Sequence, residues 1–199
     1  MRRPAPSAIG ATNGPEGELA ELEALDADPG LVEEARLEGL DLNQARLRGL
    51  RLVDVEGDGV SAVNGDLRGA ELRRVSFQRA RMTGLDLAEA RLDEVHFRSC
   101  KLDYANFRHA VIEHVTFEDC VLTDADFQGA HIYAARFSGC QLGKADFTKA
   151  ELAHVDLRGS ELALAGSVLG LGGATIDSLQ LMDLARTMAQ ELGIAVEDS

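Results

Sequence analysis

Large apolar residues recur at every fifth position along most of this chain. From Phe77 to Leu157 each fifth residue is Phe, Leu, Ile or Met, and a smaller apolar residue stands two positions before it, as Ala105 stands before Phe107. A period of five matches neither a helix nor a plain strand. It matches an extended chain that turns a corner every five residues, because residues two apart in a strand point to the same side.

Glycine often occupies the second of the two residues that make each corner. Corners that need a positive φ favour glycine there. The glycines in this position are Gly39, Gly49, Gly59, Gly69, Gly84, Gly129, Gly139 and Gly159.

A second period, of twenty residues, indicates that four corners close one coil. All phenylalanines fall in two columns offset by ten, and the three cysteines also lie twenty apart. The columns are Phe77, Phe97, Phe117, Phe137; Phe107, Phe127, Phe147; and Cys100, Cys120, Cys140. We interpret the cysteines as small core residues with free thiols, because their side chains point in parallel and their number is odd.

Units such as Ala105-Asn106-Phe107, Ala125-Asp126-Phe127 and Ala145-Asp146-Phe147 resemble the pentapeptide-repeat family. That resemblance implies an all-β solenoid, a right-handed quadrilateral β-helix with five residues per side. The repeat runs in one register from Ala35 to Leu164, which makes about six and a half coils. We expect short α-helical caps at both ends of this β-helix, because solenoids need their open ends covered.

The flanking segments differ in composition from the repeat. We expect a disordered tail at 1–14 and an acidic amphipathic helix within 15–34, either a lid on the first coil or a partner-binding helix. After a glycine-rich connector, 165–199 are expected to hold a helix beginning at Asp177 and a short terminal strand at 194–196. The apolar stripe of this helix either caps the last coil, forms a homodimer, or does both. The stripe comprises Leu181, Leu184, Met188 and Leu192.

The repeat weakens between Val53 and Gly65, where Gly57 and Ala62 occupy positions that elsewhere carry large residues. Either a loop projects from the rod here, or the second coil stays in line and is poorly filled. A projecting loop of ten residues would leave the later register unchanged, so the pattern is compatible with both structures.

Charge is unevenly distributed along the chain. The formal net charge is −14, but the repeats hold 21 acids and 17 bases, and much of the excess lies in the flanks. One wall carries few charges and forms a candidate protein-binding surface. Its residues are Val111, His114, His131, Tyr133 and His154. All five histidines fall at outward positions, and the sequence contains no catalytic motif and no metal or cofactor motif.

The resemblance implies a non-enzymatic protein. In the gyrase-binding branch of the family, the rod mimics DNA, occupies the DNA site of a type II topoisomerase and protects it from quinolone-like inhibitors. The alternative is a general interaction scaffold without DNA mimicry. Neither requires direct nucleic-acid binding. The absence of a long apolar run and of a secretion signal predicts no membrane span and a cytoplasmic location.

Overall fold

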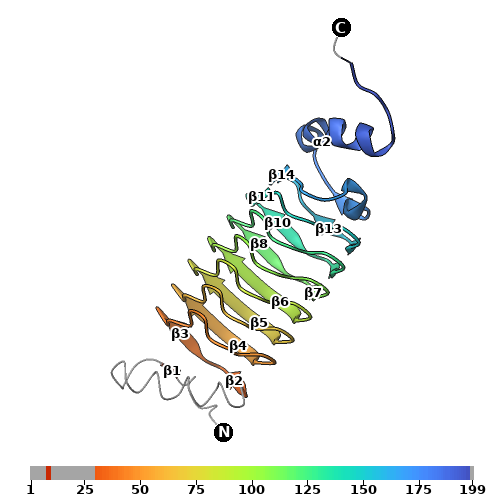
Figure 1. The fold of residues 1–199 in the computed structure, drawn as a ribbon. Coiled ribbons are helices and arrows are strands. Elements are labelled where there is room, and N and C mark those ends of the chain that lie inside the picture. Colours follow the sequence, from red (N-terminus) through yellow and green to blue (C-terminus); the bar gives the residue numbers. More distant parts are fainter. Residues whose placement is uncertain (1–7, 10–29, 198–199) are drawn as a thin grey trace.

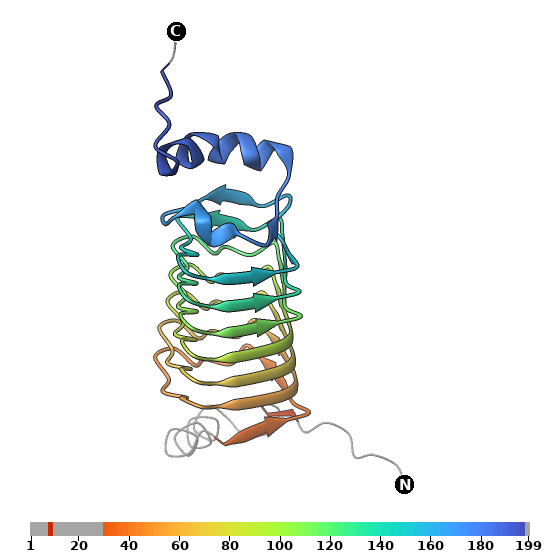
Figure 2. The same ribbon diagram turned by 90° about the vertical axis from the view of Figure 1, so that its right-hand side faces the viewer.

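The computed structural model describes residues 8–9 and 30–197 of the 199-residue chain. They form a right-handed quadrilateral β-helix, a parallel β-solenoid of about seven turns, followed by a C-terminal helix (Figures 1 and 2). The elements are β1 (Ala8–Ile9), β2 (Leu31–Glu33), β3 (Arg36–Glu38), β4 (Arg51–Asp58), β5 (Glu71–Gln78), β6 (Arg91–Arg98), β7 (Val111–Glu113), β8 (Thr116–Glu118), β9 (His131–Tyr133), β10 (Arg136–Ser138), β11 (Gln141–Gly143), β12 (Glu151–Ala153), β13 (Val155–Asp156), β14 (Glu161–Ala163), η1 (Val168–Leu171), β15 (Ala174–Thr175) and α2 (Ser178–Glu191).

Each strand of the repeat pairs in parallel with the chain twenty residues further on, as Phe77 pairs with Phe97. This register confirms four sides of five residues per coil. All eight predicted glycine corners have positive φ, and other residues adopt the same conformation at equivalent corners, among them His114 with φ 54°. The corners therefore follow the period of the repeat even where glycine is absent.

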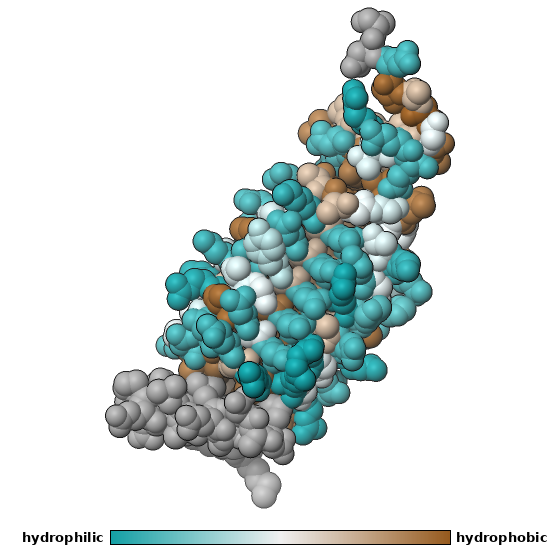
Figure 3. Space-filling view, in the orientation of Figure 1, coloured by the Kyte–Doolittle hydropathy of each residue, from teal (hydrophilic) through white to brown (hydrophobic). Residues whose placement is uncertain are grey.

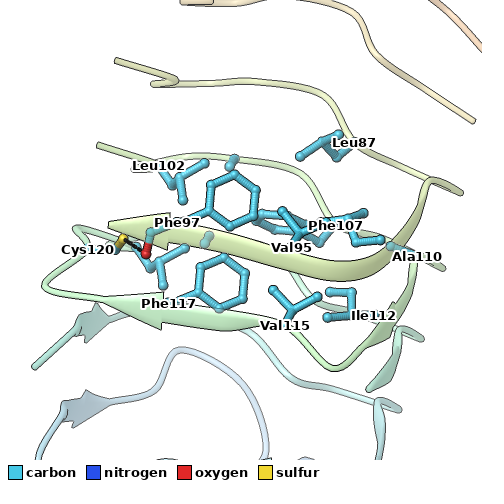
Figure 4. Close-up of a cluster of buried hydrophobic side chains, with 14 of the residues drawn as sticks. Leu87, Val95, Phe97, Leu102, Phe107, Ala110, Ile112, Val115, Phe117 and Cys120 are labelled. Carbon is cyan, nitrogen blue, oxygen red and sulfur yellow. Dashed lines mark hydrogen bonds between the residues drawn. The ribbon is translucent and has the colours of Figure 1, made fainter. Parts of the chain in front are cut away.

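The interior holds the apolar columns that the sequence predicts. Phe117 is fully buried, and its ring stacks on that of Phe97 at a centroid distance of 5.0 Å (Figure 4). On its other side it stacks on Phe137 at 4.6 Å. Because identical side chains repeat at each coil, aromatic faces meet along the rod axis, in the offset-stacked arrangement that aromatic pairs favour.

The cysteines also lie inside, as predicted. All three are free and buried. The thiol of Cys120 donates to the carbonyl oxygen of Phe97 at 3.4 Å (Figure 4), and the thiol of Cys140 donates to that of Phe117 at the same distance. Each thiol is thus placed as a small core group with a backbone partner.

The second coil is poorly filled but remains in line with its neighbours. β4 pairs with β5 in an unshifted register, with Leu52 opposite Leu72 and Gly57 opposite Phe77. A Cβ atom added to Gly57 would lie 2.6 Å from Cδ1 of Phe77. The Phe77 ring therefore occupies space that the glycine leaves, and no loop projects at 53–65.

Two sides extend the solenoid beyond the predicted limits. Leu31–Glu33 form β2 opposite Arg51–Val53, in the last part of the 15–34 segment that was expected to hold the acidic helix or cap. The repeat pattern is weak at Val32, because Gly30 stands two positions before it, where most other units have an apolar side chain. At the other end, β15 pairs with β13, with Ala174 opposite Val155, which makes a last side one residue out of register. Within 1–14, where a disordered tail was expected, Ala8–Ile9 form β1 and pair in parallel with Arg36 and Leu37 of β3. The rest of the predicted tail and the acidic helix lie outside the described residues.

Helix α2 lies across the C-terminal end of the coil stack (Figure 2). Asp177 is its N-cap, where the sequence predicted the helix to begin, and forms a capping box with Gln180. The buried amide of Gln180 donates to the carbonyl oxygens of Leu157 and Ser160, each at 2.7 Å. Residues 194–196 form no strand and are exposed, so the terminal strand expected there was wrong.

Candidate protein-binding surface

The five residues that the sequence singled out on one wall lie together on consecutive coils; we call them the His–Tyr patch. β7 pairs with β9, and β9 with β12. This register stacks Val111 and His131 in one column and places Tyr133 in the next. His114 and His154 occupy the adjoining corner, where both have positive φ.

Tyr133 is held between two histidines. Its ring meets His114 edge to face at 5.8 Å and His154 edge to face at 5.4 Å, with interplanar angles of 88° and 86°. Such pairs contribute about 0.5–1.5 kcal/mol each beyond area burial. Tyr133 is nevertheless 45% exposed. The ring is therefore pre-oriented and accessible, which lowers the entropy cost of using it as a contact.

Two carboxylates border the patch. Nδ1 of His131 lies 2.9 Å from Oε2 of Glu151, and Nδ1 of His114 lies 3.2 Å from Oδ1 of Asp93. The sequence pattern did not single out either acid, although the twenty-residue period places Glu151 directly beside His131. The two histidines are thus oriented by acids on neighbouring coils.

A surface hollow of about 340 Å³ lies within the patch. Its lining is Val111, Glu113, His131, Ile132, Tyr133, Glu151, Leu152 and Ala153. Ile132 and Leu152 are buried, whereas Glu113, Tyr133 and Glu151 are exposed, so the lining is both apolar and polar. A hollow of this composition suits an apolar or aromatic side chain from a protein partner.

The other coil surfaces are a mosaic of opposite charges. Arginines pair with carboxylates across neighbouring coils, as Arg74 pairs with Asp54 at 2.6 Å and Arg108 with Asp126 at 2.6 Å. The hydrogen bond from Arg158 lowers the pKa of Asp156 to about 2. Several carboxylates on these walls are therefore paired with arginines, although Asp66, Asp86, Asp126 and Asp146 share one column. A DNA duplex, in contrast, has an evenly negative surface.

Apolar residues gather on and around α2 at the C-terminal end, while the coil surface facing the viewer in Figure 3 is largely hydrophilic. Leu184 is buried and Met188 is half-buried against the last coil. In contrast, Leu181 and Leu192 are 49% and 73% exposed. The predicted stripe is therefore divided between a face that caps the coil and a face that remains in solvent.

Neither a metal-binding cluster nor a membrane-spanning helix occurs in the part of the chain that the structure describes. Within 8–9 and 30–197, no group of three or more His, Cys, Asp or Glu side chains is arranged to hold a metal ion. No helix among these residues has the length and apolar character needed to cross a membrane.

The fold and surface define a filled parallel β-solenoid that displays side chains on four flat walls. The family model of the pentapeptide repeat region matches residues 59–127 and 90–165, and the chain belongs to the pentapeptide-repeat family. No curated protein matches the chain in sequence.

Solved pentapeptide-repeat structures are similar to it at low identity. One structure of QnrB1, a plasmid-mediated fluoroquinolone resistance protein, is 22% identical with a TM-score of 0.42, and the match covers 84% of this chain and 90% of that one. Rfr23 from the cyanobacterium Cyanothece 51142 is 13% identical with a TM-score of 0.48, covering 80% and 99%.

Proposed function

We propose that this chain is a non-enzymatic protein-binding rod that contacts its partner through the His–Tyr patch. The observation that carries the proposal is the hollow beside Tyr133, whose ring is fixed between two histidines on a wall with few charges. Exposed aromatic residues that are already ordered are typical anchors of protein interfaces. The remaining walls, with paired charges, would stay in solvent. We place the protein in the cytoplasm, where three thiols would remain reduced.

A matched pair of tyrosine variants tests this proposal. Tyr133→Lys places a charge in the hollow, whereas Tyr104→Lys makes the same change at a 62% exposed position on a different wall. The bait proteins would be compared by quantitative affinity capture from the source cells. We expect a partner bound by the wild type and by Tyr104→Lys to be lost from Tyr133→Lys by at least tenfold. Equal capture by all three baits would refute the patch as the interface.

The second candidate is a DNA mimic that binds DNA gyrase. Its support is the family and the formal net charge of −14. The paired and nearly balanced charges of the coils favour the scaffold instead, because a duplex carries about one negative charge per 1.7 Å. A gyrase supercoiling assay and a quinolone-induced cleavage assay separate the two. If micromolar protein inhibits gyrase supercoiling or protects gyrase from quinolone-induced cleavage, the DNA mimic is favoured. If it does neither, the interaction scaffold is favoured.

We further propose that the exposed face of α2 forms a homodimer with a second copy. A two-fold pairing through this end would cover both copies of Leu181 and Leu192 and double the length of the rod. The variant for testing this is Leu181→Arg with Leu192→Arg, since Leu184 is buried in its own chain and its replacement would unseat the cap. Light scattering should show a dimer for the wild type and a monomer for the double variant. A monomeric wild type would assign α2 to capping alone.

A further inference from the structure

An apolar cavity of about 420 Å³ lies inside the N-terminal coils of the solenoid. Among the described residues, its lining runs from Leu31 on β2 to Phe97 in the fourth coil. Glu33 is the one charged residue among these lining residues. The cavity lies at the opposite end of the rod from α2 and is separate from the His–Tyr patch.

The cavity follows from particular residues in the second coil. Gly57 and Ala62 stand where the third coil has Phe77 and Met82. Phe77 leans toward Gly57, so that its stack on Phe97 opens to 5.6 Å and 20°, compared with 5.0 Å and 5° for the next pair. Ala62 and Met82 both line the cavity, and the short side chain of Ala62 leaves part of this space unfilled.

A void of this size is an exception in a protein interior. Cores are normally packed as densely as organic crystals. An engineered apolar cavity of roughly 150 Å³ stays dry and binds benzene. Ligand sites usually begin at about 300 Å³ and are lined mainly by apolar side chains. The cavity therefore has the volume and the surface of a ligand site.

We propose that this cavity binds an unbranched alkyl chain with an uncharged or cationic head group. The four walls limit its width, while a lining that spans three coil steps gives a length of about 14 Å at the strand spacing. The lining side chains are almost all aliphatic or aromatic. Burying a methylene there contributes about 0.8 kcal/mol, whereas an unpaired polar group would be penalised.

The head-group preference follows from the charges around the mouth. Glu33, Glu34 and Glu38 lie at this end, on β2, β3 and the corner between them. The same turn also carries Arg36, Arg46 and Arg48, of which Arg36 pairs with Glu56 at 3.1 Å and Arg48 with Asp66 at 2.7 Å. Glu33 lines the cavity itself, so a carboxylate head group beside Glu33 and Glu34 would be repelled, whereas an ammonium group there would be attracted.

Methionine methyl groups provide a direct test on the full chain. Met82 lines the cavity, while Met182 and Met188 lie on α2 at the other end. In protein labelled with ¹³C at the methionine methyls, we expect decylamine and 1-decanol to shift the Met82 resonance saturably and leave those of Met182 and Met188 in place. Decanoate should bind at least tenfold more weakly. Equal binding of decanoate would overturn the head-group assignment.

Ala62→Leu is the matched variant, because leucine occupies the same position in the fourth coil as Leu102. It narrows the cavity at the second coil without changing the surface, because Ala62 is buried, and the circular dichroism spectrum should match that of the wild type. We expect it to weaken decylamine binding at least tenfold. An unresponsive Met82 in the wild type, an equal response in Ala62→Leu, or equal shifts at Met182 would each overturn the proposal.

The chain's own acidic segment is the competing occupant. Leu22→Ser with Leu25→Ser removes two of its apolar residues. If this change moves the Met82 resonance without ligand while wild-type Met82 ignores decylamine, the segment fills the cavity and the proposal is wrong. If Met82 in the double variant stays in place and still responds to decylamine, the alkyl-chain site is supported.

Discussion

Replacing Phe117 by alanine should destabilise the rod more than the same replacement at Phe77. Phe117 stacks on aromatic rings on both sides and meets Phe107 edge to face at 6.1 Å. Among the described residues, Phe77 has a single stacked neighbour, at 5.6 Å, and it already borders the cavity. The pair therefore compares one residue type in one column under two degrees of packing.

The magnitudes follow from the packing around each ring. Truncating a buried phenylalanine to alanine costs about 3–5 kcal/mol, and each aromatic pair contributes about 0.5–1.5 kcal/mol beyond area burial. We expect about 5 kcal/mol for Phe117→Ala and about 3 kcal/mol for Phe77→Ala. Glu118→Ala is the surface control: its carboxylate lies 3.3 Å from Arg98 with 43% of the side chain exposed, and its loss should cost less than about 0.5 kcal/mol.

Urea unfolding followed by far-ultraviolet circular dichroism measures these differences. The m-values should agree among the variants, because a lower value would report fraying of the N-terminal coils in place of global unfolding. Phe117→Asp should prevent folding or leave insoluble protein, since it buries a charge without a partner. A cost for Phe77→Ala equal to or larger than that for Phe117→Ala would refute the packing argument, and a large effect of Glu118→Ala would refute the assignment of inside and outside.

Three further predictions concern the cavity, the thiols and a carboxylate at the edge of the core. Ala62→Leu should raise the free energy of unfolding by about 1–2 kcal/mol, measured by the urea midpoint, because it buries methylene groups in existing space. The cysteines should react slowly with a thiol reagent in the native protein and give three labels after unfolding; contact with the neighbouring thiols and burial raise the pKa of Cys120, which also disfavours the reactive thiolate. The pKa of Asp156 is lowered to about 2, first by the Arg158 hydrogen bond. Its contribution is therefore complete above the unfolded pKa of about 3.9 and is lost as the pH falls through about 2. The stability difference between wild type and Asp156→Asn, measured by urea unfolding across this range, should shrink accordingly; a difference that does not change with pH would contradict it.

The solenoid could be predicted from the sequence because the inward positions, the corners and the strand pairing all follow the same repeat. The inward column at Phe117, the corner at Gly129 and the pairing of Phe97 with Phe117 all follow from one period. A single repeated unit fixes register, burial and turn geometry together, so an error at one position is corrected by its neighbours. The limits of the rod were less predictable, because β2 and β15 depart from the repeat in side-chain size or register.

The candidate surface could be predicted only in part. The twenty-residue period brings His131 and Tyr133 to the same wall as His114, and the structure places them together. The period does not predict the edge-to-face packing of Tyr133 between two histidines, since that packing depends on side-chain rotamers. The size of the N-terminal cavity was also unpredictable, because it depends on how far Phe77 moves into the space left by Gly57.

The two departures from the repeat lie on opposite faces of the coiled chain, one inside and one outside. The cavity results from inward positions that are too small, and the His–Tyr patch results from outward positions with too few charges. In a solenoid each coil contacts mainly its neighbours, so a change in the second coil should have little effect on the fifth and sixth. Ala62→Leu should therefore alter alkyl-chain binding without affecting partner capture, and Tyr133→Lys should do the reverse. If either variant changed both activities, the two sites would be coupled through the coil stack, and the separate assignment of the two functions would be wrong.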